Sequence, residues 1–244
     1  MPPPPTPPPI TKLTILNEKK YKPQTFTYDF STKLTKTLVN VANDKLSFIL
    51  HDVFTEEECK DFIAEAERQG FEEAMVNNGT NPTLDKDFRK GGRCVINNQK
   101  KANEIWSRIK FYIPKQWDDD KVKGLNPKLR VLKYENGDFF KAHTDHFHVE
   151  KDGSEQSYLT IQLYLNEGFK GGNTTFLTDK DDEENVAVVP RTGSVLVFQK
   201  EMMHEGSLLE DGVKYTLTTD VMYENTINPW MRNRHNSYSR RVMD

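Results

Sequence analysis

The chain has 244 residues, of which 35% are hydrophobic and 29% are charged, and its formal net charge is −3. This length and composition predict one domain with a sizeable core, and the balanced charge gives no basic excess with which to neutralise the phosphates of a nucleic acid. No apolar run could span a bilayer and only two cysteines are present, Cys59 and Cys94, so we expect no membrane partner and a reducing, cytoplasmic location.

Proline dominates the start of the chain. Seven of residues 2–9 are proline, which fixes φ and removes a backbone donor, so residues 1–10 are expected to be an extended, disordered tip. Residues 11–224 are expected to form a single folded domain, in which KLSFIL (45–50) predicts an early strand. Residues 225–244 contain four arginines and are expected to form a basic C-terminal tail.

Two amphipathic helices are expected within about 55–112. The first follows Thr55, whose spacing to Glu58 predicts a capping box, and it ends at Gly70. The second covers about 99–112, where apolar residues repeat at helical spacing. The segment between the helices is rich in Asn, Gly and charge, which predicts a long loop or loose hairpin of a length typical of a functional lid.

From residue 128 onward the hydrophobic period changes from 3.6 to 2. Short strands separated by Gly-, Asp- and Asn-containing turns are predicted at KLRVLKY (128–134), SYLTIQLYLN (157–166), GNTTFL (172–177), NVAVVP (185–190), SVLVFQ (194–199) and VKYTLTTDVMY (213–223). Many short strands without helices between them favour a β-sandwich or jelly roll, with its core at about 128–223. The fold class is therefore α+β and mainly β, with N-terminal helices that support the β core.

Three histidines and an aspartate occur within KAHTDHFH (141–148). Successive side chains of a strand point to opposite faces, so if 139–147 is extended, His143 and Asp145 share one face. The other face carries a competing metal-binding pattern of the kind found in metal-binding cupins, in which the ligands would be His146, His148, His204 and either Glu150 or Glu155. Both patterns predict a metal site, and the alternation of side chains does not choose between them.

The pair formed by His143 and Asp145 needs a third ligand from elsewhere. Two histidines and one carboxylate make a facial triad that leaves open positions on Fe(II). Outside the cluster, His204 follows the strand SVLVFQ, where a jelly roll returns to the same mouth, whereas His51 precedes the barrel and His235 lies in the tail. His204 is therefore the predicted third ligand.

A polar strand face accompanies this histidine. Asp211-Gly212 predicts a turn, after which Lys214 and every second residue to Asp220 lie on one face. The hairpin brings Lys214 near His204, where its ammonium could hold the carboxylate of a small acid. Tyr134, on the element before the histidine cluster, could donate a hydrogen bond to the same carboxylate.

Three segments carry a family resemblance: YENGDFFKAHTD, YLTIQLYLNEGFKGGNTTF and HEGSLLEDGVKY. Over about residues 129–223 the chain resembles the Fe(II)- and 2-oxoglutarate-dependent dioxygenases of the prolyl 4-hydroxylase superfamily, and a lysine at the spacing of Lys214 matches the collagen-type prolyl hydroxylases. The resemblance implies a double-stranded β-helix (jelly roll). It also implies that iron is bound by His143, Asp145 and His204, that 2-oxoglutarate is bound by Lys214 and Tyr134, and that the pocket is lined by Thr160, Gln162 and Tyr164.

By the same resemblance the chain is an enzyme. It would use Fe(II), O2 and 2-oxoglutarate, with ascorbate as a reductant, to hydroxylate an unactivated C–H and release succinate and CO2. The first expectation for the substrate is a prolyl residue in a protein or peptide, with Arg93 facing the substrate. The alternatives are a small metabolite and a non-catalytic, cupin-like metal-binding module. Nucleic acid is not expected as a partner.

Overall fold

The computed structural model describes residues 14–15, 24–26, 34–39, 41, 45–77, 82–178 and 184–225. The expectations for the proline-rich tip at 1–10 and for the tail after residue 225 lie outside the described residues. The division of the chain into tip, domain and tail therefore stays a prediction.

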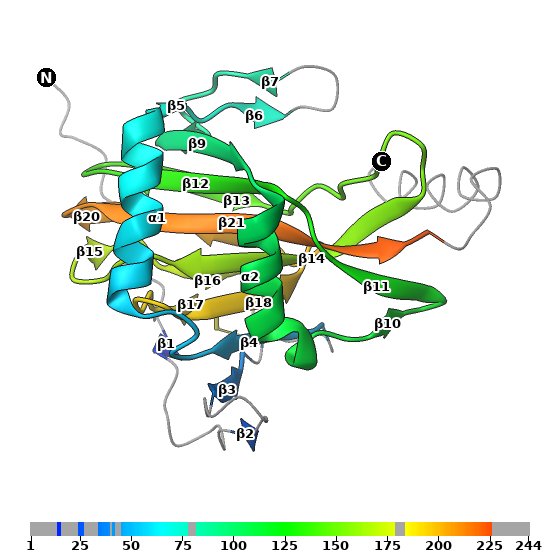
Figure 1. The fold of residues 1–244 in the computed structure, drawn as a ribbon. Helices are drawn as coiled ribbons and strands as arrows, with labels where there is room; N and C mark the ends of the chain where they lie inside the picture. Colours follow the sequence, from blue (N-terminus) through cyan, green and yellow to red (C-terminus); the bar gives the residue numbers. More distant parts are fainter. Residues whose placement is uncertain are drawn as a thin grey trace, which may run out of the picture.

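Two sheets make up most of the described structure (Figure 1). The smaller sheet has the order β1 (Thr14–Ile15), β17 (Val186–Val188), β16 (Thr174–Phe176), β19 (His204–Gly206), β13 (Phe139–His143) and β8 (Arg89–Lys90). The larger sheet has the order β2 (Gln24–Phe26), β3 (Leu34–Leu38), β4 (Ser47–Leu50), β18 (Val195–Gln199), β14 (Glu155–Tyr164), β21 (Lys214–Glu224), β12 (Lys128–Tyr134), β9 (Gly92–Asn97) and β5 (Glu72–Glu73).

Shorter strand pairs complete the architecture. In the larger sheet β21 also pairs with β11 (Asp120–Leu125), which forms a hairpin with β10 (Gln116–Trp117). Two further antiparallel pairs are β15 (Lys170–Gly171) with β20 (Leu209–Asp211), and β6 (Val76–Asn77) with β7 (Pro82–Thr83). The β6–β7 pair agrees with the loose hairpin expected between the two helices.

Both α-helices lie on one face of the larger sheet (Figure 1): α1 (Glu56–Gln69) and α2 (Gln99–Ile109). The capping box that was predicted for α1 is confirmed, because Thr55 Oγ1 accepts from the N–H of Glu58 while the Thr55 N–H donates to the Glu58 carboxylate. α2 is followed directly by a 3-10 turn (Lys110–Tyr112). The expected helix at 99–112 is therefore an α-helix that ends in a 3-10 turn. Neither α-helix in the described residues is both long and apolar enough to cross a bilayer.

Alternating side chains divide the larger sheet between two environments. On β12 and β14, residues such as Leu129, Val131 and Ile161 point toward the helices and are buried in the main core with Phe62 and Ile105. The residues in between point toward the smaller sheet, since strand side chains alternate in direction. One face of the larger sheet is thus sealed by the helices, and the other face is left to form a site.

At one end, apolar side chains close the space between the two sheets. The cluster includes Phe198 and Leu196 from β18 together with Phe176 and Val188 from the smaller sheet. The phenyl rings of Phe176 and Phe198 meet edge to face, with 5.3 Å between their centroids. The two sheets thus pack against each other through their inner faces. This arrangement confirms the predicted jelly roll, a mainly β fold in which helices support one sheet.

The turn between β17 and β18 contacts the chain before α1. Gly193 has φ +78°, its carbonyl accepts from the N–H groups of Val53 and Phe54, and its own N–H donates to the carbonyl of Tyr164. A Cβ at this position would lie 1.9 Å from the carbonyl oxygen of Phe54. The turn therefore requires glycine for two independent reasons, the positive φ and the close approach.

We expect Gly193→Ala to reduce the free energy of unfolding by more than about 3 kcal/mol, since the strain of a positive φ adds to the overlap with Phe54. For a chain of this size, the corresponding fall in Tm is roughly 6–12 °C. Gly168→Ala is the matched control, because Gly168 has φ +87° but no atom within 4 Å of the added Cβ. Thermal unfolding of both variants tests the idea, and an equal fall in Tm would refute the role of the Phe54 contact.

Candidate active site

Two facing histidines and one aspartate meet at the inner side of the smaller sheet. His143 ends β13 and His204 begins β19, and these residues are direct partners in the antiparallel pairing. Asp145 lies two residues beyond the end of β13, where its N–H donates to the Lys200 carbonyl. One ligand atom from each of the three residues lies within 4.8 Å of the others.

Hydrogen bonds orient both imidazole rings. His143 Nδ1 lies 2.7 Å from the carbonyl oxygen of Lys141, and His204 Nδ1 lies 2.9 Å from that of Met202. A carbonyl only accepts, so Nδ1 carries the proton in each ring and the lone pair of Nε2 is free to bind a cation. This arrangement is the one expected of metal-binding histidines, whose other nitrogen donates to a backbone or carboxylate oxygen.

The protonation states also suit a divalent metal. Burial, and then the charge of His204, lower the pKa of His143 to about 4, so its imidazole is neutral near pH 7. Burial opposes ionisation of Asp145, but the charges of His204 and Lys200 outweigh it and lower the pKa to about 2. Two imidazoles and one carboxylate are the donor set of a facial triad for Fe(II), so the residues fit that ion.

Lys214 is a buried cation without an anion. Its Nζ donates to the carbonyl of Gly172 over 2.5 Å and lies 5.5 Å from the ring centroid of Tyr134, its cross-strand partner. No carboxylate among the described residues lies within 4.0 Å of it, and burial lowers its pKa to about 7. An unpaired buried charge is costly, so this position fits the carboxylate of a ligand such as 2-oxoglutarate.

A single cavity of about 590 Å³ connects these groups. Its lining includes the three residues of the triad together with Lys214, Tyr134, Thr160 and Gln162. The volume is in the range of small-ligand sites. The sequence-predicted residues are therefore brought together with one exception.

Tyr164 does not line the cavity, and its predicted place in the pocket is wrong. The side chain is 1% exposed and packs in the apolar cluster between the sheets. Its hydroxyl donates to Thr174 Oγ1, which also accepts from Gln162 and whose side chain does reach the cavity. The family resemblance had implied a pocket position for Tyr164, but apolar side chains of β18 and β16 surround it instead.

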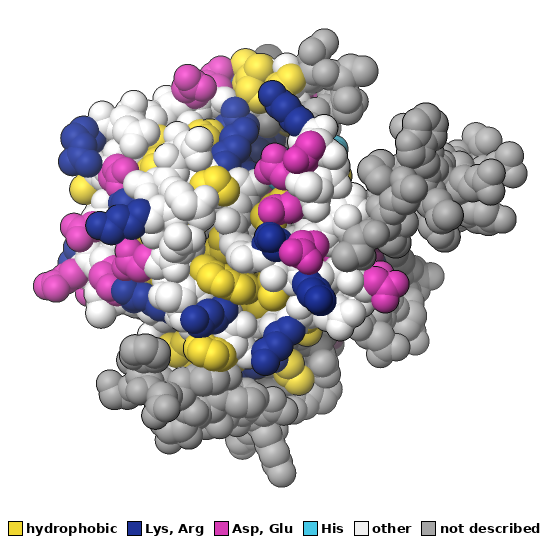
Figure 2. All heavy atoms as spheres, turned by 45° about the vertical axis from the view of Figure 1, so that its right-hand side comes forward, with side chains coloured by type: hydrophobic (Ala, Val, Ile, Leu, Met, Phe, Trp, Pro, Cys, Tyr) yellow, Lys and Arg dark blue, Asp and Glu magenta, His cyan; other side chains and the backbone are white. Residues whose placement is uncertain are grey.

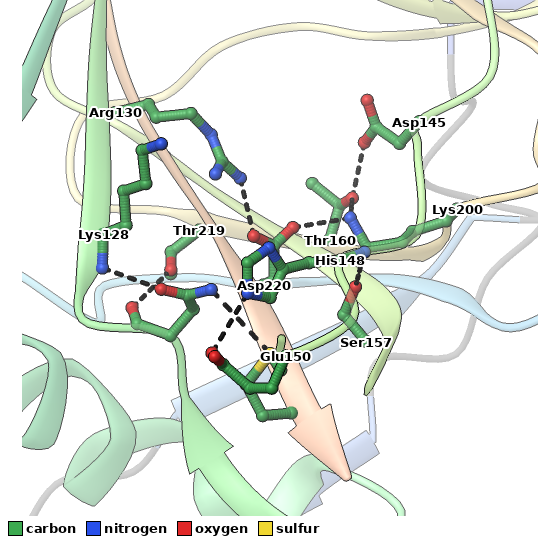
Figure 3. Close-up of polar contacts among 12 residues, drawn as sticks. Lys128, Arg130, Asp145, His148, Glu150, Ser157, Thr160, Lys200, Thr219 and Asp220 are labelled. Atoms are coloured by element: carbon green, nitrogen blue, oxygen red, sulfur yellow. Dashed lines mark hydrogen bonds and ion pairs between the residues drawn. The ribbon is translucent and has the colours of Figure 1, made fainter. Parts of the chain in front are cut away.

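A chain of polar contacts runs behind Asp145 (Figure 3). Thr160 Oγ1 donates to Asp145 Oδ2 over 2.5 Å, and Lys200 Nζ donates to Thr160 over 3.4 Å and to Asp220 over 2.5 Å. The other oxygen of Asp220 accepts from Arg130 over 2.9 Å. Lys200 is thus neutralised by a carboxylate, which distinguishes it from the unpaired Lys214.

Sequence reasoning missed Arg130 and Lys200. Arg130 could have been found, because it shares the inward face of its strand with Tyr134, and a charged residue at an inward position is unusual. Lys200 follows β18 directly and carries no local signal, since its partners Thr160 and Asp220 are distant in sequence.

We expect Thr160→Val to weaken Fe(II) binding by roughly 10- to 100-fold, the usual effect of removing a partner that orients a metal ligand. The isosteric change keeps the β-branched shape and removes only the hydroxyl that donates to Asp145. Thr218→Val is the control, because Thr218 lines the same cavity but makes no hydrogen bond to Asp145. Anaerobic Fe(II) titration measures both variants, and equal affinities would show that Thr160 does not support the ligand.

The two remaining histidines of the cluster, His146 and His148, also line the cavity but lie outside the triad. His148 Nε2 lies 3.1 Å from the carboxylate of Glu150. His146 and His148 take no part in a compact group of three possible metal ligands, and among the described residues the triad is the one such group. This geometry counts against the cupin-like pattern. The alternation argument assumed an extended segment at 139–147, whereas the strand β13 itself ends at His143.

Comparison with known proteins agrees with this geometry. Residues 129–220 match the family model of the 2OG-Fe(II) oxygenase superfamily. The matched segment contains the triad and Lys214, and together with the fold it supports a 2OG-Fe(II) oxygenase domain, a class of enzyme that uses Fe(II), 2-oxoglutarate and O2. The relatives that the chain resembles in sequence are prolyl 4-hydroxylases.

Two of these relatives come from Arabidopsis thaliana. Prolyl 4-hydroxylase 2 is 24% identical over 213 residues, which are 73% of this chain and 67% of the relative. Probable prolyl 4-hydroxylase 8 is 26% identical over 174 residues, and the match spans 62% of this chain and 57% of the relative.

Two solved structures share the fold. A viral collagen prolyl hydroxylase from Paramecium bursaria Chlorella virus-1, in complex with 2-oxoglutarate, superposes with a TM-score of 0.54 at 17% identity, covering 75% of this chain and 99% of that one. A prolyl hydroxylase from Trichoplax adhaerens, in complex with a hypoxia inducible factor peptide fragment, gives a TM-score of 0.55 at 16% identity, covering 73% and 83%.

Proposed function

We propose that this chain hydroxylates a prolyl residue of a protein or peptide, with His143, Asp145 and His204 holding Fe(II). One observation carries the proposal: a triad of metal-binding side chains and an unpaired, buried Lys214 share one cavity. A non-catalytic metal-binding module would not need the unpaired ammonium of Lys214 in the same cavity as the metal. The prolyl 4-hydroxylase relatives support the choice of substrate.

Each residue of the cavity has a distinct task in this proposal. Lys214 pairs with the distal carboxylate of 2-oxoglutarate, and the phenol of Tyr134 assists as a donor. Thr160 keeps the Asp145 carboxylate in one orientation. Iron, 2-oxoglutarate and O2 together supply the oxidant: one oxygen atom enters the C–H bond of the substrate, the other enters succinate, and CO2 is released. The protein contributes positioning and exclusion of bulk water.

The test is to incubate the protein with Fe(II), 2-oxoglutarate, O2 and ascorbate, together with a set of proline-containing peptides. Mass spectrometry should detect the gain of one oxygen atom on proline, with succinate formed in equal amount. Asp145→Asn is the inactive control, since it removes the anionic ligand with little change of shape. Hydroxylation of other residues but never of proline would contradict the proposed substrate.

A further inference from the structure

Two arginines from different sheets line the cavity. Arg89 begins β8 in the smaller sheet, and Arg93 lies on β9 in the larger sheet. Both line the cavity that contains the triad. The Arg89 guanidinium lies 4.3 Å from the ring centroid of Phe140, and that ring stacks on His143 at 3.6 Å between centroids. Arg89 is therefore separated from a triad residue by one aromatic ring.

Neither arginine has an anionic partner in the part of the chain that the structure describes. The Nε atoms of both are buried and make no hydrogen bond, and no carboxylate lies within 4.0 Å of either guanidinium. Burial, and then the positive charge of Arg89, lower the pKa of Arg93, while Glu72 across from it on β5 offsets this only in part. Two like charges that line one cavity without a carboxylate partner are unfavourable unless an anion binds near them.

The cavity lining carries an excess of positive charge, to which these two arginines contribute. Its lining contains five cationic side chains, Arg89, Arg93, Arg130, Lys200 and Lys214, against three acidic ones, Asp145, Glu205 and Asp220. Arg130 and Lys200 share Asp220, and Lys214 is assigned to the cosubstrate. A divalent metal and dianionic 2-oxoglutarate cancel each other, so the excess of two positive charges remains in the loaded enzyme.

The outer surface has no comparable excess on the side drawn in Figure 2. There the Lys and Arg side chains stand among Asp and Glu side chains, with small hydrophobic groups between them. Lys86 and Lys90, in the same segment as Arg89, each pair with a carboxylate, from Glu73 and Asp138 respectively. Arg89 and Arg93 thus differ from these neighbouring lysines, because they line the cavity without a carboxylate partner, where a ligand could reach them together with the metal.

We propose that Arg89 and Arg93 form a subsite for a carboxylate of the substrate, so that the preferred target is a proline next to an acidic group. Paired guanidinium groups suit this ligand, because their planar N–H donors match the two oxygens of a carboxylate. The identity of the reacting group rests on the function proposed above, whereas the carboxylate subsite rests on the cavity alone. The carboxylate belongs to an acidic residue beside proline in a peptide or to a free proline.

Binding without turnover tests the subsite. The protein, loaded with Fe(II) and 2-oxoglutarate under anaerobic conditions, is titrated with two end-blocked peptides that differ only in Asp or Asn beside a proline. Free L-proline and L-prolinamide form the second pair. We expect a preference of about 10- to 100-fold for the carboxylate member of at least one pair, and the pair that shows it identifies the source. Equal binding within both pairs, or no binding of any ligand, would overturn the subsite.

Variants assign the preference to the arginines. Arg93→Gln and Arg89→Gln should each reduce the preference to near unity while leaving the affinity for 2-oxoglutarate unchanged. Lys86→Gln is the matched control, because it removes one charge from the same segment without lining this cavity. If Arg93→Gln does not fold, Arg89→Gln carries the test. A preference that survives in the variants, or a variant that loses 2-oxoglutarate instead, would overturn the assignment.

Addition of O2 to the same samples separates the two proposals. A carboxylate preference without any hydroxyproline would contradict the proposed function and leave the subsite standing. Hydroxyproline formed at equal efficiency from the Asp and Asn peptides, without a preference in the second pair, would contradict the subsite and leave the function standing.

Discussion

Replacing Lys214 with alanine is expected to weaken 2-oxoglutarate binding by roughly two to three orders of magnitude, the usual cost of truncating one partner of a buried charge pair. Lys214 is 4% exposed and has no carboxylate partner among the described residues, so the ligand loses a buried counter-charge that no protein group already neutralises. Fe(II) binding should be unchanged, because Lys214 does not belong to the triad. Anaerobic titration of both ligands measures the effect.

The same lysine predicts a pH dependence with a definite sign. Its pKa is lowered to about 7 by burial, so the free protein carries the ammonium below pH 7 and loses it as the pH rises. Binding of 2-oxoglutarate above pH 7 must then take up a proton. The dissociation constant of 2-oxoglutarate should therefore rise with pH, by up to about tenfold per pH unit. Lys214→Arg stays charged and should not show this fall. A flat profile in the unaltered protein would contradict the role of Lys214.

The second large effect concerns the metal. His204→Ala is expected to weaken Fe(II) binding by more than about 100-fold, beyond what the loss of a supporting hydrogen bond costs. His204 is 5% exposed and faces His143 across β13 and β19, so no solvent-exposed group replaces it. The control is His146→Ala, because His146 lines the cavity but lies outside the triad.

Metal content after anaerobic loading distinguishes the two metal-binding patterns. Retention of iron in His146→Ala and its loss in His204→Ala is the expected pair of results. Equal loss in both variants would favour the cupin-like pattern, in which His146 is a ligand.

Short sequence patterns predicted the helix start and the strand faces, because interactions between residues close in sequence determine both. The Thr55–Glu58 capping box satisfies backbone donors within a single turn, so four residues are enough to locate the start of α1. On β21, the period-2 pattern separates the core face from the cavity face, and the predicted polar face, which begins at Lys214, does line the cavity. The grouping of His143 with Asp145 also came from alternation, although Asp145 lies beyond the strand.

Long-range packing decides what the sequence left open. Tyr164 shares the inward face with Thr160, yet only the side chains of the opposing strands determine that Tyr164 is sealed in the core. Arg89 and Arg93 are close in sequence but belong to different sheets, so their convergence on one cavity follows from how the sheets face each other. Such contacts have no period and no spacing that a single sequence displays.

The most direct test of this account is the visible spectrum of the anaerobic, Fe(II)-loaded protein titrated with 2-oxoglutarate. We predict a metal-to-ligand charge-transfer band that is absent in His143→Ala and that requires far higher 2-oxoglutarate concentrations in Lys214→Ala. Protein shown to contain iron that develops no such band at any 2-oxoglutarate concentration would contradict the central claim that the triad and Lys214 form one cosubstrate site.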